Sequence, residues 1–170
     1  MKIRIKKLDE RAKIPTRGSD YAAGYDLYAL EKADVYAGKT TFVHTGIAVE
    51  ISEGYFGAIY ARSGLACKHG IRPANCVGII DSDYRGEVMI ALHFDKESVV
   101  MKQVPVPGVA YRNVTQSQAT YNDDTSFTVE SGDRVAQLII QKFEEVEFEE
   151  VEELEDSSRG EGGFGSSGTK

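Results

Sequence analysis

The sequence has few of the residues that hold small secreted folds together. Its two cysteines, Cys67 and Cys76, are too few for a disulfide framework or for a zinc site built on four ligands of this type. Such a pair is typical of reduced thiols in a cytosolic protein. The first ten residues, MKIRIKKLDE, also lack the apolar segment of a secretion signal. We therefore expect a cytoplasmic protein.

Long hydrophobic runs are missing as well. No apolar segment approaches the roughly 20 residues that a membrane-spanning helix needs, so we expect no membrane partner. Proline is sparse, with 4 residues, and the 17 glycines follow no collagen-like period. With 41% hydrophobic residues, 170 residues suffice for one domain with an ordinary core, which we place in residues 1–156.

Negative charge is concentrated in one segment. The whole chain has a net charge of −7, yet residues 144–156 alone hold nine acidic side chains and no basic one. Because residues 157–170 add +1, the body of the protein, residues 1–143, carries a net charge of +1. An acidic protein is a poor partner for nucleic acid, and we expect none. The near-neutral charge of the body is still compatible with binding of a small anionic ligand.

Alternation of apolar and polar residues is the strongest pattern in the chain. Period-two repeats predict half-buried strands, and they occur at residues 3–5, 47–51 and 88–94. A more continuous apolar run, residues 135–140, suits a strand buried on both faces. Turn signals separate these segments, so the pattern predicts an all-β sandwich or barrel.

Three segments depart from this pattern. Residues 98–127 contain a Pro-Val-Pro-Gly sequence and a polar run, which is typical of an elaborated loop or a small added subdomain. Residues 144–156 fit either a continued strand or a helical stripe. Residues 157–170 hold five glycines and four serines, a composition typical of a flexible linker.

An arginine, a hydroxyl group and a predicted helix start lie side by side at Arg62, Ser63 and Gly64. We expect a short helix over 64–69, with Ser63 as its N-cap and Gly70 just after its end. Free N–H groups at a helix start and a guanidinium together suit an anion. Alternatively, the segment is a capped helix with a surface arginine.

Residues 75–86 are consistent with a hairpin: an apolar strand, a polar turn, and a second strand that begins at Glu87. Asp81 directly follows three apolar residues, so it could be held at the edge of a cleft as a general base. The alternative is an aspartate that accepts backbone hydrogen bonds in a turn. Asp83 would share a face with Asp81 on a strand, but two carboxylates alone make a weak metal site.

Two further segments carry polar groups in suggestive places. In residues 132–138 a turn enters the apolar run, where Gln137 needs a hydrogen-bond partner if it is buried, and where Asp133 and Arg134 could pair at the surface. In the tail, glycines allow a backbone to approach a phosphate closely. Phe164 supplies a ring that could cover a base.

Together these segments resemble the trimeric, all-β dUTP diphosphatases, or dUTPases. The resemblance covers most of residues 1–97 and 128–170. Five motifs occur in the order found in that family: AGYDL (23–27), RSGL (62–65), GIIDSDYRG (78–86), GDRVAQL (132–138) and the glycine-rich tail (159–168).

The resemblance implies a distorted β-barrel of jelly-roll type that forms a homotrimer, with each active site at a subunit interface and closed by the tail of a third subunit. The implied reaction is dUTP + water → dUMP + pyrophosphate. Asp81 would be the general base that activates the attacking water. Tyr84 would pack on the deoxyribose, and Asn75 with the backbone around Gly78 and Ile80 would recognise uracil.

For the triphosphate, similarity points to residues from several motifs: Arg62, Ser63, Gln137, Arg159, Ser166 and Ser167. The resemblance also implies that Gly64 and Gly165 bind the substrate. Phe164 would cover the uracil. Mg²⁺ would be carried by the phosphates and by water, without direct protein ligands, which agrees with the habit of magnesium to keep its waters. Asp26 and Gln137 would then lie in the outer shell of the Mg²⁺ ion. Alternatively, Asp26 would have a structural role.

Two departures from the family pattern are visible. Ala61 stands where the family usually has proline, and the spacing between the third and fourth motifs is longer than usual, which marks 98–127 as an insertion. Some phage-encoded members are elaborated there, where the extra piece is associated with regulatory proteins, so a binding role of the insertion is a second hypothesis. A related family deaminates dCTP, but it lacks the Phe-Gly-Ser-Ser tail present at residues 164–167.

Overall fold

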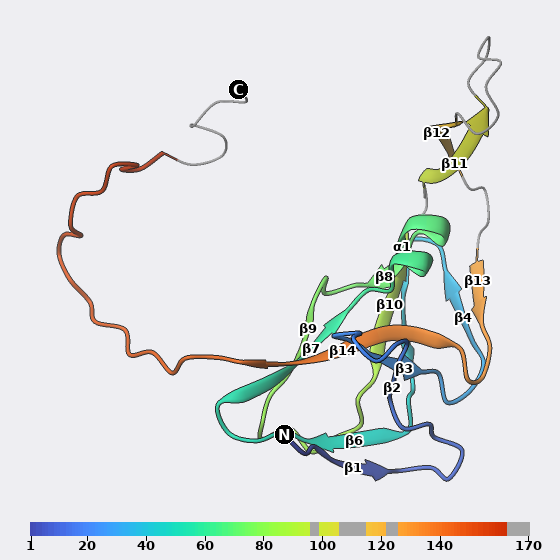
Figure 1. The fold of residues 1–170 in the computed structure, drawn as a ribbon, viewed down its shortest axis with the longest axis horizontal. Helices are drawn as coiled ribbons and strands as arrows, with labels where there is room; N and C mark the ends of the chain where they lie inside the picture. The colour runs from blue at the N-terminus through green and yellow to red at the C-terminus, as the bar shows by residue number, and fades with distance from the viewer. Residues whose placement is uncertain (96–98, 106–114, 122–125, 163–170) are drawn as a thin grey trace.

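A computed structural model describes residues 1–95, 99–105, 115–121 and 126–162 (Figure 1). In these residues the regular secondary structure is β-strand apart from one short helix, as the sequence predicts. The elements, in chain order, are β1 (Arg4–Lys7), β2 (Thr16–Arg17), β3 (Tyr25–Tyr28), β4 (Ala33–Tyr36), β5 (Thr40–Val43), β6 (Ile47–Glu50), β7 (Tyr55–Tyr60), α1 (Ser63–His69), β8 (Ile71–Pro73), β9 (Gly78–Ile80), β10 (Ile90–Phe94), β11 (Val99–Pro105), β12 (Thr115–Tyr121), β13 (Ser126–Val129) and β14 (Arg134–Lys142).

The largest sheet has five antiparallel strands in the order β2-β3-β14-β7-β9. Its centre is β14, the predicted apolar run, which pairs with β3 on one side and β7 on the other. In this register Gln137 lies opposite both Asp26 and Tyr60. Residues from the first and fourth sequence motifs are therefore neighbours in the sheet, and the second motif follows directly after β7.

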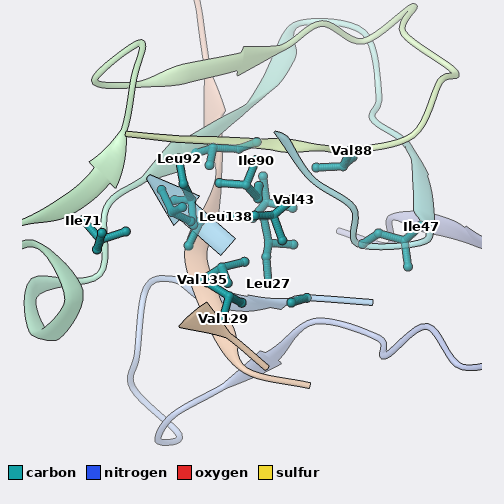
Figure 2. Close-up of a cluster of buried hydrophobic side chains, with 14 of the residues drawn as sticks. Leu27, Val43, Ile47, Ile71, Val88, Ile90, Leu92, Val129, Val135 and Leu138 are labelled. Atoms are coloured by element: carbon teal, nitrogen blue, oxygen red, sulfur yellow. The ribbon is translucent and has the colours of Figure 1, made fainter. Parts of the chain in front are cut away.

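The core lies between this sheet and the smaller sheets β5-β10-β8, β4-β13 and β1-β6. Figure 2 shows side chains from several sheets, among them Leu27, Val43, Ile90 and Val135, that point toward one another. In β10 the alternation predicted from the sequence is confirmed, because Ile90, Leu92 and Phe94 are buried while the residues between them are half-buried. In β6 the first three residues are all buried, so the half-buried interpretation is wrong there.

The predicted helix is present, and Gly70 ends it with a left-handed backbone (φ 68°). The predicted N-cap is wrong. Arg62 occupies the cap position, because its extended backbone (φ −83°, ψ 127°) makes Ser63 the first helical residue, and no side chain caps the helix start. Leu65 packs against the core as expected. α1 is not long and apolar enough to cross a membrane, and it is the one helix among the described residues.

The long segment between β10 and β13 contains a two-stranded antiparallel sheet, in which β11 and β12 pair with each other. Figure 1 shows this pair projecting beyond α1, away from the larger sheets. β13 returns to the body and pairs with β4, with Phe127 opposite Val35.

Two further interpretations of the sequence are wrong. The expected hairpin around residues 81–86 is wrong, because β9 pairs with β7, whereas β10 pairs with β5 and β8 in another sheet. The N–H of Tyr84 donates to the carbonyl of Asp81 (3.2 Å), and this turn carries the chain out of the first sheet.

The acidic segment 144–156 forms neither of the two predicted structures. It has no regular secondary structure and extends away from the body, with Phe148 94% and Leu154 87% exposed (Figure 1). Nine carboxylates repel one another, and the apolar residues between them have no surface of their own chain to cover.

Candidate functional site

A cavity of about 250 Å³ lies where the five-stranded sheet meets the β5-β10-β8 sheet. It brings together five of the residues that the sequence predicts for the base, the sugar and the attacking water: Asn75, Gly78, Ile80, Asp81 and Tyr84. Apolar side chains complete the wall, and three of them, Phe42, Ile59 and Met89, come from β5, β7 and the loop before β10.

The backbone before β9 is shaped to expose polar groups to this cavity. Cys76 has a left-handed backbone (φ 62°), and the N–H of Val77 donates to the carbonyl of Asn75 at 2.6 Å. The backbone at Gly78 is closely packed, because a Cβ there would lie 3.2 Å from Nδ2 of Asn75 and 3.3 Å from Cβ of Ile59. An amide and nearby main-chain groups at the wall of an otherwise apolar cavity suit recognition of a base edge.

The 81–89 loop carries the other polar groups of the cavity. Asp81 follows β9 directly and is exposed. A general base must be accessible to the water molecule from which it takes a proton. The hydroxyl of Tyr84 donates to the carbonyl of Glu87 at 2.9 Å. This hydrogen bond helps to define the shape of the loop at the rim of the cavity.

The carboxylate of Glu87 connects this loop to residues 44–46. Its Oε1 accepts the N–H groups of Thr45 (3.1 Å) and Gly46 (2.7 Å), and its Oε2 accepts Nδ1 of His44 (2.8 Å). Burial raises the pKa of Glu87, but the hydrogen bonds from His44 and from the two backbone groups outweigh it, so the pKa lies below its usual value. The carboxylate is therefore held in its charged form.

A second cluster forms around Asp26, which is 4% exposed on β3. Its Oδ2 accepts Nη1 of Arg134 at 3.2 Å, and its Oδ1 lies 3.3 Å from Nε of Arg62, an ion-pair contact without the alignment of a hydrogen bond. Nη1 of Arg62 also donates to the carbonyl of Arg134 (2.8 Å). One buried carboxylate thus positions two guanidinium groups.

The predicted phosphate-binding residues of the body gather near this cluster. Ser63 and Gly64 are the first two residues of α1, both exposed, and Gln137 lies half-buried in the sheet beside Asp26. Gly24 leaves the space for Gln137, because a Cβ at Gly24 would lie 3.2 Å from the Gln137 Cβ. A shallow cavity of about 210 Å³ opens beside Arg62 and Arg134. The arrangement offers positive charge and hydroxyl donors to an anion.

The two groups of residues do not share a cavity. None of the residues that line the cavity of Asp81 also lines the cavity of Arg62. Arg159 lies on the extended C-terminal segment, where its Nε donates to the carbonyl of Gly162 (2.7 Å). The remaining predicted residues lie outside the described residues: Phe164, Gly165, Ser166 and Ser167.

Three residues of the site were not predicted from the sequence. Arg134 was expected to pair with Asp133, but Asp133 instead accepts the N–H of Glu130 (2.9 Å), and Arg134 turns to Asp26. Glu87 and His44 had no motif that marked them. The sequence did carry one signal for the Asp26 contacts. Asp26 is an acidic residue next to a buried apolar position, and a buried carboxylate requires a charged or hydrogen-bonding partner.

Metal ligands do not cluster in the part of the chain that is described: no group of three His, Cys, Asp or Glu side chains there is arranged to hold an ion. Both carboxylate oxygens of Asp26 already face guanidinium groups. Cys67 and Cys76 are free and exposed.

Comparison with known proteins identifies the family of the chain. The sequence model of the dUTPase family matches residues 10–104 and 103–168. The chain is 38% identical to the deoxyuridine 5'-triphosphate nucleotidohydrolase of Nautilia profundicola, over 99% of each chain. It is 40% identical to the enzyme of the same name from Oryza sativa, over 98% of this chain and 80% of the other.

Solved structures give the same result. The fold is similar to that of the dUTPase of Staphylococcus bacteriophage 80alpha with dUPNHPP, with a TM-score of 0.76 and 29% identity over 99% of each chain. A mutant of the phage 80alpha enzyme with dUpNHpp gives a TM-score of 0.77 and 30% identity, again over 99% of each chain.

The matched motifs, the fold and the relatives define a nucleotide hydrolase of the all-β type. The chain belongs to the dUTPase family, and its activity is the hydrolysis of dUTP. Its relatives include dUTPases encoded by phages.

Replacement of Asp26 tests the buried cluster. Asp26→Asn removes the charge that holds Arg62 and Arg134, so we expect the free energy of unfolding to fall by about 1–3 kcal/mol, as for a hydrogen bond to a charged group. The measurement is urea unfolding at neutral pH. Asp20→Asn, at an exposed position, is the matched control. Equal stability of both variants would contradict a stabilising role of the cluster.

Proposed function

We propose that Asp81 is the general base of dUTP hydrolysis. Its carboxylate takes a proton from water, the water oxygen forms a bond to the α-phosphorus, and the bond from that phosphorus to the bridging oxygen breaks, so that pyrophosphate leaves and dUMP remains. The observation that carries this proposal is that Asp81 lies at the rim of the cavity formed by Asn75, Gly78 and Tyr84. A base and the groups that place its substrate then act at one location.

The uracil ring enters this cavity and meets the Asn75 amide and the main chain of β9, while the ring of Tyr84 lies against the deoxyribose. A 2′-hydroxyl would collide with Tyr84, which favours dUTP over UTP. A cavity with fixed donors and acceptors also rejects cytosine, because mispaired buried polar groups are costly.

The triphosphate is bound by Arg62, Ser63 and Gln137, with Arg159 and the tail serines from the C-terminal segment. Asp26 acts through Arg62, whose guanidinium it fixes, and this arrangement supports its structural role over the outer-shell role. When bound, Mg²⁺ would be carried by the triphosphate and would neutralise phosphate charge. A structure of the phage phi11 dUTPase, 24% identical with a TM-score of 0.69, concerns the coordination of a structural Mg(II) ion in that protein.

The working enzyme is a homotrimer in which two chains form each site and the tail of the third chain closes it. Support comes from the separation of the Asp81 cavity from the Arg62 cavity, which share no lining residue. The rim of the Asp81 cavity is also apolar and open, with Phe42 61%, Ile79 55% and Met89 39% exposed. Such a rim is typical of a surface that another chain covers.

The acidic segment 144–156 crosses to a neighbouring chain and brings the tail to its site. It extends from the body (Figure 1) and carries nine negative charges and exposed apolar residues. A suitable partner surface is β1, which follows Lys2 and contains Arg4, Lys6 and Lys7, beside an apolar groove of about 470 Å³ that Ile3 and Ile5 help to line. Opposite charge and exposed apolar surface on both sides favour this contact.

In the cell the enzyme removes dUTP before it enters DNA and supplies dUMP for dTMP synthesis in the cytoplasm, which is the host cytoplasm if a phage encodes the chain.

A second role is binding of a regulatory protein by the inserted element. The observation that favours it is the separate β11–β12 sheet, which projects from the body (Figure 1). Two structures of one relative at 29% identity, the dUTPase of Staphylococcus bacteriophage 80alpha and a mutant of it, concern control of the transfer of virulence genes by a proto-oncogenic G protein-like mechanism.

Pyrophosphate release measured with every dNTP and with UTP, in the presence and absence of Mg²⁺, tests the function. We expect dUTP with Mg²⁺ to be hydrolysed far faster than the others. Asp81→Asn is expected to bind dUTP but to lose about a thousandfold in turnover, in the range for a lost general base. Near-wild-type turnover of this variant would exclude Asp81 as the base. Deamination of dCTP as the main activity would instead favour the related deaminases.

Truncation after Ser158 tests the tail. The shortened chain should keep the oligomeric state of the full chain, because the acidic segment remains, but its kcat/KM for dUTP should fall at least about tenfold, as expected when phosphate contacts are lost. A chain that ends at Gly168 is the control, since it keeps every assigned tail residue. Unchanged kinetics after truncation at Ser158 would show that the tail is only a linker.

Deletion of residues 100–125, closed by a short glycine-serine linker, separates the two roles. Because β13 and the cavities lie outside the deleted residues, dUTP turnover should stay within about threefold of wild type, since loop length itself has a small energetic effect. A folded protein of unchanged oligomeric state that has lost its turnover would contradict a separate role of the insertion.

A further inference from the structure

The 81–89 loop bears the proposed base and the proposed sugar-contacting ring, yet it belongs to no sheet. Within residues 81–87 the hydrogen bonds fall into two classes. Those of Ser82, Tyr84 and Arg85 stay inside the loop. Among the described residues, the hydrogen bonds that join 81–87 to the rest of the chain are all accepted by the carboxylate of Glu87.

The partner of this carboxylate is a rigid part of the body. Thr45 is 2% exposed, and its hydroxyl donates to the carbonyl of Val88 at 2.5 Å. Gly46 has a left-handed backbone (φ 68°), and a Cβ there would lie 2.9 Å from the Cβ of Ala12. Residues 44–46 therefore offer Glu87 donors in a fixed place, since neither the buried hydroxyl nor the packed glycine leaves them room to move.

The main chain at Glu87 also holds the Tyr84 ring. This peptide is itself bonded to the body, because the N–H of Val88 donates to the carbonyl of Ile47 at 2.9 Å. The hydroxyl of Tyr84 donates to the main-chain carbonyl of Glu87, so the ring folds back over its own loop. Gly86 permits this, because a Cβ there would lie 2.4 Å from the Tyr84 hydroxyl oxygen and 2.6 Å from its Cζ. The ring is thus attached to a residue whose own side chain is attached to the body.

We propose that Glu87 is a positioning residue that holds Tyr84 against the sugar and thereby sets the preference for deoxyribonucleotides over ribonucleotides. This inference rests on the proposed role of Tyr84 in dUTP hydrolysis. Glu87 helps to line the cavity of Asp81, and its role in this proposal is exerted through Tyr84 and the loop. A steric block is effective only when its wall is rigid, and the bonds from residues 44–46 supply that rigidity.

The test compares kcat/KM for dUTP and for UTP in wild type and in variants of Glu87. Glu87→Ala should lower the dUTP/UTP ratio at least about tenfold, in the range that pocket fit contributes to specificity. Glu87→Gln keeps an oxygen that can accept both backbone N–H groups, so it should retain a ratio within about threefold of wild type. Glu53→Ala, at an exposed position, is the matched control and should leave the ratio unchanged.

The ratio separates positioning from general stability, because a variant that is only less stable loses both activities equally. A folded Glu87→Ala enzyme with the wild-type ratio would overturn the proposal. If that variant does not fold, Glu87→Asp replaces it: its carboxylate is shorter by one methylene and cannot keep all three bonds, so the ratio should fall at least about threefold. An unchanged ratio there would also overturn the proposal.

Gly86→Ala provides an independent check, since it displaces the Tyr84 ring while the Glu87 carboxylate keeps its partners. It should lower the ratio as Glu87→Ala does, and a wild-type ratio would contradict the link between ring position and specificity. Failure of the proposed function is distinguishable from these outcomes, because it would appear in wild type as absence of dUTP hydrolysis and would overturn both proposals.

Discussion

The pairing of β14 with both β3 and β7 is the constraint on which the phosphate-side residues depend. It places Asp26, Gln137 and Tyr60 in one row of the five-stranded sheet, and it brings Arg62 and Arg134 to the same carboxylate. A buried aspartate is costly unless it is paired, and here the guanidinium groups that stabilise it are held in place by it. The first, second and fourth motifs, far apart in the sequence, become one cluster because of a single central strand.

The third motif follows a different principle. Its aspartate and tyrosine lie on a loop that passes from one sheet to another, so no strand ladder fixes them. Catalytic groups often lie on loops that a rigid scaffold positions. In this chain the scaffold holds the loop through the ionised side chain of Glu87, whose partners 44–46 are packed against the core, and through the N–H of Val88, which donates to the carbonyl of Ile47. Rigid placement and an open cavity rim are therefore compatible in the same segment.

The motifs, the all-β class, the central strand and the short helix could be predicted from the sequence, because they depend on local composition and period. The absence of a hairpin at residues 81–86 could not be predicted from the sequence, because tertiary packing decides which strands pair. In the structure β9 pairs with β7. The partner of Arg134 failed for the same reason: Asp133 is its sequence neighbour, but Asp26 is its spatial neighbour. Glu87 carried no signal, because its function lies in a contact with residues about forty positions away.

The proposal that each catalytic site is shared between chains is tested most directly by mixing two inactive variants. Asp81→Asn and Arg62→Ala chains are unfolded, mixed in equal amounts and refolded together, and dUTP hydrolysis is compared with that of each variant alone. If Asp81 and Arg62 of one site come from different chains, random assembly leaves both residues intact in about a quarter of the sites, so about a quarter of the wild-type activity should return. If the mixture is no more active than the separate variants, both residues belong to one chain and the shared site is wrong.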